Sequence, residues 1–163
     1  MRVMPNNFAF IDGQNVYLGI SERGWKIDWK RFRVHLKESY GVEKAYYFIG
    51  FVPENQSLYQ SLQSYGYILI FKPITYRSDG KPKGNVDAEL VLQAMIDFNE
   101  YEGAVLVTND GDFACLARYL TEKRKLERVL SPNRAKCSAL LKRAAGARID
   151  FLEDARKKIE YKS

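Results

Sequence analysis

The stretch Ala104-Val105-Leu106-Val107-Thr108-Asn109-Asp110-Gly111-Asp112-Phe113 joins an apolar run to two aspartates that a single glycine separates. Continuous apolar runs of this kind are typical of parallel strands that helices cover on both faces. A helical pattern starts at Asp112 and returns Phe113 and Leu116 to the core. The stretch therefore predicts a strand, a sharp corner and a helix, with both carboxylates above the strand. Ordinary turn and cap chemistry would also account for Asp110 and Asp112.

The same alternation of strand and helix runs along the whole chain. Strands are predicted at residues 7–12, 43–50, 67–75, 104–108, 128–131 and 147–152. Helices are predicted at 28–40, with Asp28 as the N-cap, and at 54–65, 86–101, 112–123, 133–145 and 153–161. This order predicts an α/β fold, a three-layer α/β/α sandwich with a doubly wound, mainly parallel sheet.

The length of 163 residues predicts one domain over 1–163, ending in a basic helical segment at about 153–163. The sequence has no run of 18 apolar residues and no hydrophobic leader, so we expect a cytoplasmic protein with no membrane contact. The net charge of +6 is uneven, because residues 123–163 hold 13 Lys and Arg against 5 Asp and Glu. A basic segment would steer a polyanion toward an acidic site, although solvated helix faces explain it equally well.

Two more aspartates occupy positions that suit a site. Asp12 ends the first predicted strand and precedes Gly13, where turn chemistry is the plain alternative. Asp87 shares a helix face with Leu90 and Ala94, which must face the sheet, so its carboxylate should point inward. An aspartate at a helix N-terminus is also favoured by the helix dipole, but that preference gives no reason for the inward face.

Three motifs, in this order and at these intervals, resemble those of the NYN domain family, the PIN-like nuclease group that includes LabA-like proteins. They are Asp12-Gly13-Gln14-Asn15, Lys83-Gly84-Asn85-Val86-Asp87 and Thr108-Asn109-Asp110-Gly111-Asp112-Phe113. The resemblance implies a PIN-like sandwich whose first and fourth strands are adjacent. It also implies that Asp12, Asp87, Asp110 and Asp112 bind Mg²⁺ or Mn²⁺ and act on RNA. Asn109 stands where glycine is the more usual residue.

Carboxylates and water suit hard cations such as Mg²⁺, and one or two bound ions can activate water for phosphodiester hydrolysis. We expect Asp12 and Asp110 as direct ligands, and Asp87 and Asp112 as ligands through water or as groups that orient the attacking water. Hydrogen bonds from Asn15, Thr108 and Asn109 would support them. The single histidine, His35, fits packing better than catalysis, which argues against a zinc site built on histidines.

Residues 76–84 predict a polar loop without regular structure. Its cations Arg77, Lys81 and Lys83 are candidates for contacts with the substrate backbone, although charges in an exposed connection also serve solubility alone.

The sequence thus predicts a metal-dependent ribonuclease acting on single-stranded or structured RNA. The alternative is a catalytically silent RNA-binding or regulatory scaffold that keeps the metal cluster, and homo-oligomer formation is left open. Neither the Gly-x-Gly-x-x-Gly of a Rossmann enzyme nor a P-loop signature occurs.

Overall fold

Six parallel strands form the central sheet of the computed structural model, which describes residues 4–80, 82–83 and 85–162, with only the backbone of 82 and 83. In chain order the strands are β1 (Asn7–Asp12), β2 (Val42–Phe51), β3 (Tyr67–Pro73), β6 (Gly103–Val107), β7 (Leu126–Ser131) and β8 (Ile149–Phe151). Across the sheet the order is β3-β2-β1-β6-β7-β8, and every neighbouring pair is parallel. The predicted doubly wound sheet is confirmed, and β1 lies beside β6, the fourth strand of this sheet.

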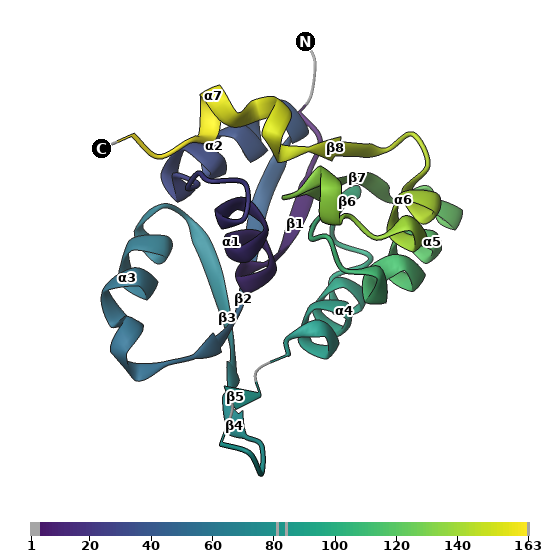
Figure 1. Ribbon diagram of the computed structural model, residues 1–163. Coiled ribbons are helices and arrows are strands. Elements are labelled where there is room, and N and C mark those ends of the chain that lie inside the picture. Colours follow the sequence, from purple (N-terminus) through teal and green to yellow (C-terminus); the bar gives the residue numbers. More distant parts are fainter. Residues whose placement is uncertain (1–3, 81, 84, 163) are drawn as a thin grey trace.

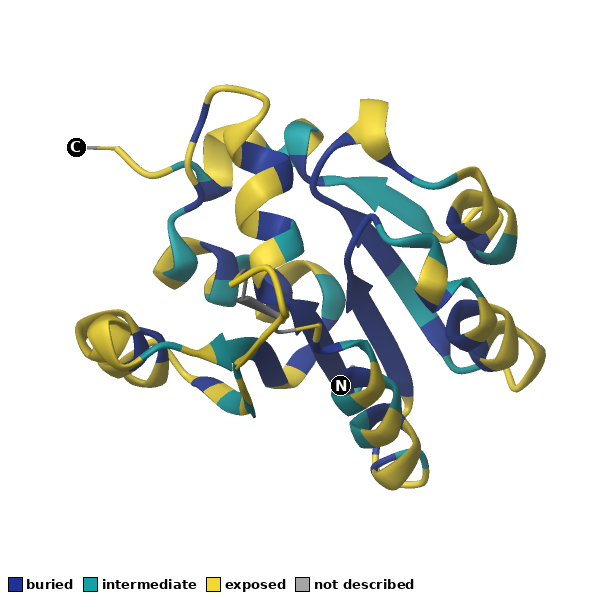
Figure 2. Cartoon of the chain, turned by 60° about the horizontal axis from the view of Figure 1, so that its bottom comes forward, coloured by how far each residue is buried: buried dark blue, intermediate teal, exposed yellow. Residues whose placement is uncertain are grey.

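In the described part of the chain, seven α-helices connect and cover these strands (Figure 1). They are α1 (Gly13–Ser21), α2 (Trp29–Tyr40), α3 (Gln56–Ser64), α4 (Asp87–Ile96), α5 (Ala114–Glu122), α6 (Ala139–Ala145) and α7 (Arg156–Ile159). Side chains of α4, α5 and α6 pack on one face of the sheet, and those of α1, α2 and α7 pack on the other. The three-layer sandwich is therefore confirmed, and Figure 2 shows buried strands between helices that are exposed on their outer sides.

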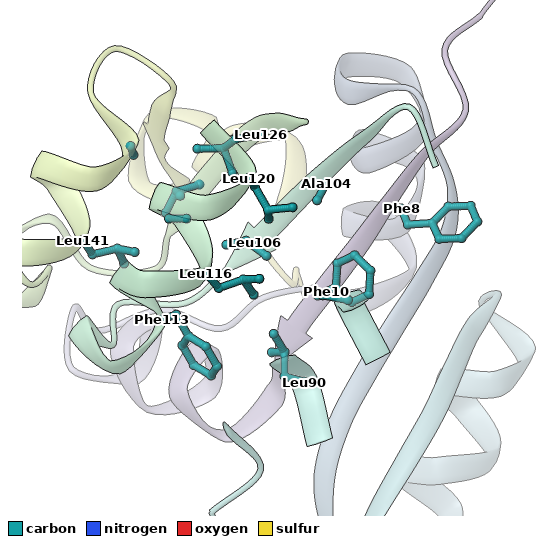
Figure 3. Packing of buried hydrophobic residues seen from close by; sticks show 14 of the residues in the cluster. Phe8, Phe10, Leu90, Ala104, Leu106, Phe113, Leu116, Leu120, Leu126 and Leu141 are labelled. Atoms are coloured by element: carbon teal, nitrogen blue, oxygen red, sulfur yellow. The ribbon is translucent and has the colours of Figure 1, made fainter. Parts of the chain in front are cut away.

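The two cores follow from the alternation of side chains along each strand. Phe8 and Phe10 of β1 join Leu106 of β6 in the core beneath α4 and α5 (Figure 3). Their neighbours Ile11 and Val107 join the opposite core. Each of these buried side chains contributes roughly 1.5–3 kcal/mol. Because both faces are covered, β6 and the interior of β1 are apolar, which is why the sequence pattern identified them.

Helix α1 was not predicted from the sequence. It starts directly after Asp12, and its two glycines and β-branched residues weaken its intrinsic helix propensity. Packing decides its formation, because Val16, Gly19 and Ile20 are buried at helical spacing. Gly19 allows close approach to the sheet edge: a Cβ there would lie 3.1 Å from Pro132 Cγ. The spacing of the buried residues was the available signal for this helix.

The prediction that residues 76–84 lack regular structure was wrong in part. The predicted strand 67–75 ends at Pro73, and a short antiparallel hairpin follows, formed by β4 (Thr75–Tyr76) and β5 (Pro82–Lys83). Gly80, at a φ of 82°, turns the chain at its tip. Figure 1 shows this hairpin projecting away from the sheet, at the opposite end of the molecule from α7.

Element ends mostly follow local capping chemistry. The predicted cap of α2 is confirmed, since Asp28 Oδ1 accepts a hydrogen bond from the Arg31 N–H at 3.1 Å. Helix α4 ends at Ile96, earlier than the predicted 101. Its C-cap Asp97 is buried and accepts a 2.6 Å hydrogen bond from Tyr46, which ties this end to the sheet. In the part of the chain that the structure describes, no helix has the length and hydropathy needed to cross a membrane.

Candidate metal centre

Three carboxylates from three separate elements meet at the carboxyl end of the sheet. Asp12 ends β1, Asp87 is the first residue of α4, and Asp110 follows β6. One carboxylate oxygen from each lies within 4.8 Å of the others. The chain after β1 turns to one face of the sheet and the chain after β6 to the other, so this corner is the switch point where such sheets bind ligands. We call these three residues the aspartate trio.

Local structure fixes each member of the trio. Asp12 is buried between β2 and β6 at the end of the central strand. Asp87 sits on the face of α4 that carries Leu90 into the core, and its N–H donates to Asn85 Oδ1 at 2.8 Å. Asp110 caps the 3₁₀ turn η2 (Gly111–Phe113), because its Oδ1 accepts from the Asp112 N–H at 2.8 Å. The trio is therefore held by backbone geometry.

Asp112 lies beside the trio. It is exposed, and it is absent from the group of carboxylates within 4.8 Å of one another. Burial and the charge of Asp110 are the main causes that raise the pKa of Asp87, and the neighbouring Asp112 carboxyl adds to them. The structure thus places Asp87 with Asp12 and Asp110, and sets Asp112 at their edge.

Asn15 and Thr108 form a polar network that ties the two strand ends together. Asn15 Oδ1 accepts a hydrogen bond from the Asn109 N–H at 2.8 Å. The Thr108 hydroxyl accepts from the Asp110 N–H at 3.1 Å and lies 3.5 Å from Asp12 Oδ2. Both residues contact the corner that carries the trio, where the sequence analysis expected supporting hydrogen bonders.

Asn109 links the β6 corner to its neighbours. It is buried, and its Oδ1 accepts a hydrogen bond from the Ser131 hydroxyl at 2.5 Å. Its carbonyl accepts from the Ser138 N–H at 3.1 Å, just before α6. The side chain that stands here in place of the more usual glycine therefore braces β6 against β7.

Replacing Asn109 with Ala should lower the free energy of unfolding by about 1–2 kcal/mol, because a buried hydrogen bond is lost. Mn²⁺ affinity should stay nearly unchanged, since the Asn109 N–H that holds Asn15 is kept. Thermal unfolding and calorimetric titration measure the two effects. The matched control is Asn99→Ala at an exposed position, which should change stability by less than about 0.5 kcal/mol. Loss of Mn²⁺ binding in Asn109→Ala would contradict this bracing role.

The electrostatics of the trio suit a cation. Burial is the main cause that raises the pKa of Asp12 to about 6, and the charges of Asp87 and Asp110 add to it. Burial and the Asp110 charge likewise raise the pKa of Asp87 to about 6. Carboxylates that are buried and mutually repelling are costly without a counter-charge, and oxygen ligands are those that Mg²⁺ and Mn²⁺ prefer. The trio can therefore bind a metal ion.

Metal binding should strengthen as the pH rises. Both Asp12 and Asp87 must lose their protons to bind a cation, and both have a pKa of about 6. We expect the apparent Mn²⁺ affinity to rise by about a hundredfold between pH 5 and pH 8, with most of the rise below about pH 6 and little change above about pH 7. Calorimetric titration in buffers of different ionisation enthalpy should detect proton release at pH 6 and almost none at pH 8. An affinity that is constant over this range would contradict these ligands.

Two of the three predicted cationic substrate contacts can be placed, and both belong to the β4–β5 hairpin. Arg77 is exposed, and its guanidinium lies 4.0 Å from Asp79 of the same hairpin. For Lys83 the structure describes only the backbone, within β5, and Lys81 lies outside the described residues. No contact between Arg77 and the trio occurs among the described residues, so contacts from these three residues to a substrate stay predictions.

Some cations of the basic C-terminal quarter are paired with acidic side chains. Arg134 pairs with Asp154 at 2.7 Å, and Arg156 pairs with Glu160 at 3.0 Å on α7. Lys136, which the sequence analysis did not single out, is exposed two residues before Ser138, the partner of the Asn109 carbonyl. The sequence alone does not show that Lys136 lies near this corner, because the pairing of β7 with β6 brings the two segments together.

His35 contacts Ser39 and Tyr40 on α2, as expected for a packing residue.

The trio opens into a cavity of about 900 Å³. The cavity is lined by Asp12, by residues of α1, by the end of β2, and by Trp29 and Lys26. Helix α1 forms one wall of this cavity. Because that helix was not predicted from the sequence, the cavity could not be predicted either.

Comparison with known proteins agrees with this geometry. The sequence model of the NYN domain matches residues 8–152. The low amplitude and bright protein LabA of Synechococcus elongatus is 29% identical over 135 residues, which cover 76% of this chain and 73% of LabA. A crystal structure of VPA0982, a protein of unknown function from Vibrio parahaemolyticus, superposes with a TM-score of 0.79 at 22% identity, covering 99% of this chain and 100% of that one. At that identity the structural match bears on the fold alone.

Proposed function

The chain belongs to the NYN domain family, and from that premise we propose that it is a metal-dependent ribonuclease that hydrolyses phosphodiester bonds at the aspartate trio. The observation that carries the proposal is the convergence of Asp12, Asp87 and Asp110 within 4.8 Å at the switch point of the sheet. A purely structural role for three mutually repelling carboxylates would leave their electrostatic cost without a counter-charge.

The residues of the site divide into two roles. Asp12, Asp87 and Asp110 would hold Mg²⁺ or Mn²⁺, which when bound neutralises charge on phosphoryl oxygens and lowers the pKa of a coordinated water. We assign Asp112 to orienting the attacking water, because its exposed carboxyl lies beside Asp87. Asn15 and Thr108 keep the strand ends in register through their bonds to Asn109 and Asp110.

RNA is the substrate class that we propose, on the strength of the family resemblance and the cations near the site. Lys136 is exposed near the Asn109 corner, and Lys26 lines the cavity. Cations there would attract a polyanion toward carboxylates that repel it when no metal is bound.

The experiment is a titration of Mn²⁺ against the purified chain and an end-labelled single-stranded RNA. The proposal expects cleavage that rises with Mn²⁺ and stops when EDTA is added. RNA binding without turnover at any Mn²⁺ concentration would favour the silent scaffold. Cleavage that persists in EDTA would show that the activity does not depend on the trio.

A further inference from the structure

One buried tyrosine has no hydrogen-bond partner among the residues that the structure describes. The structure buries five tyrosines, and four of them donate their hydroxyls: Tyr46 to Asp97, Tyr59 to the Gly50 carbonyl, Tyr67 to the Trp29 carbonyl and Tyr101 to the Ala94 carbonyl. Tyr47 of β2 is only 3% exposed, yet no described residue hydrogen-bonds to its hydroxyl. Buried hydroxyls normally find partners, so one without a partner points to a missing one.

The Tyr47 hydroxyl opens onto the cavity beside the trio. Tyr47 lines the cavity. Its hydroxyl oxygen has no partner in the described part of the chain but is not fully enclosed by protein atoms. Gly13, which directly follows Asp12, makes room for it: a Cβ at Gly13 would lie 2.5 Å from the ring of Tyr47 and 2.8 Å from its hydroxyl oxygen. The polar end of Tyr47 is thus held against the corner that carries Asp12.

The cavity lining combines three kinds of side chain. The carboxylates of Asp12, Asp87 and Asp110 form one part of it. Trp29 packs edge to face on Tyr47, with ring centroids 4.9 Å apart, and the exposed Tyr17 lines the cavity from α1. The exposed Lys26 also lines it. The lining therefore offers a metal site for one phosphate, aromatic surfaces for a base, and a cation for another phosphate.

We propose that this cavity receives the nucleotide next to the cleaved phosphate of a single-stranded RNA, and that Tyr47 hydrogen-bonds its ribose or the edge of its base. The inference rests on the proposed function. A base reaches aromatic side chains inside a cavity only when it is unstacked and unpaired, which is how proteins read single strands. A ribose hydroxyl or a base edge would supply the partner that Tyr47 lacks.

The test compares two neighbouring tyrosine-to-phenylalanine substitutions. Both are made in the Asp110→Asn background to prevent cleavage, and binding of a fluorescent single-stranded hexaribonucleotide is followed by anisotropy. Tyr47→Phe should weaken binding about fivefold, the effect of one lost hydrogen bond, and leave the melting temperature unchanged. Tyr46→Phe, on the opposite face of β2, should lower the melting temperature and leave RNA binding unchanged, because its hydroxyl already bonds Asp97.

A deoxyribose hexamer of the same sequence separates the two sources of the contact. Weakening by Tyr47→Phe on RNA alone assigns the bond to the ribose, and equal weakening on both strands assigns it to the base. Equal affinity of the Tyr47→Phe variant and its parent on both strands would overturn the inference. Effective competition by an RNA duplex, or no binding by the parent protein, would overturn it as well.

These outcomes are independent of the nuclease assay. If the wild-type chain cleaves RNA with Mn²⁺ while Tyr47→Phe binds like its parent, the cavity assignment fails and the proposed function stands. If the wild-type chain does not cleave but Tyr47→Phe loses affinity, the cavity binds RNA and the hydrolytic function fails.

Discussion

Replacing Asp12 with Asn should reduce Mn²⁺-dependent RNA cleavage by about two to three orders of magnitude. The amide keeps the size of the carboxylate but removes a negative charge from a group of three whose oxygens lie within 4.8 Å of one another. Metal-assisted charge neutralisation is worth several kcal/mol in such reactions, which sets the expected loss. Single-turnover cleavage of an end-labelled RNA at saturating Mn²⁺ measures it.

The matched control is Asp154→Asn, which removes a surface ion pair with Arg134. Exposed pairs of this kind contribute about 0–1 kcal/mol, so cleavage should stay at the wild-type rate. Asp110→Asn should behave like Asp12→Asn. Wild-type cleavage by either trio variant would contradict the assignment of the site.

The same Asp12→Asn substitution should stabilise the metal-free protein at neutral pH. The pKa of Asp12 is raised from its ordinary value of 3.8 to about 6, so ionisation of this carboxyl opposes folding. Stability is lost as the pH rises from about 4 to about 6, and the full cost persists above that range. At pH 7.5 in EDTA the asparagine variant should gain about 3 kcal/mol, or about 9 °C in melting temperature.

Thermal unfolding in EDTA at two pH values tests this linkage. The gain from Asp12→Asn should be present at pH 7.5 and vanish near pH 3.5, where the wild-type carboxyl is protonated in both states. Asp154→Asn should show no gain at either pH. An Asp12→Asn variant that is less stable than wild type at pH 7.5 would mean that the carboxylate serves the fold.

A variant that loses activity while gaining stability cannot have lost activity by unfolding. The pair of results would show that the chain retains a strained, charged corner because the corner binds something. Added Mn²⁺ should reverse the order of stability, since it binds the folded wild-type protein and so stabilises it.

The sheet and the approach of Asp12, Asp87 and Asp110 were predictable because both depend on local patterns, whereas Asp112, predicted as a fourth member, lies outside the trio. Apolar runs such as 104–108 identify strands that are covered on both faces, and a parallel sheet brings their carboxyl ends to one edge. The helical spacing of Asp87 with Leu90 and Ala94 placed its carboxylate toward that edge, where the structure has it. No distant contact had to be known to reach this arrangement.

The parts that escaped prediction depend on contacts between distant segments. Helix α1 forms because Val16 and Ile20 are buried against the sheet, despite weak local propensity. Asn109 gains its role from Ser131, which only the β6–β7 pairing brings near. In the sequence Tyr47 is an ordinary core residue of a strand. Only the structure shows that its hydroxyl, unlike those of the other buried tyrosines, has no partner among the described residues.

The most direct test of the metal centre is a crystal soaked in Mn²⁺, with diffraction data collected to reveal the anomalous signal of manganese. The account predicts an anomalous peak among the carboxylates of Asp12, Asp87 and Asp110, and its loss in Asp12→Asn. No peak at this corner in the wild-type crystal, or an equal peak in Asp12→Asn, would contradict the claim that the trio binds a metal ion.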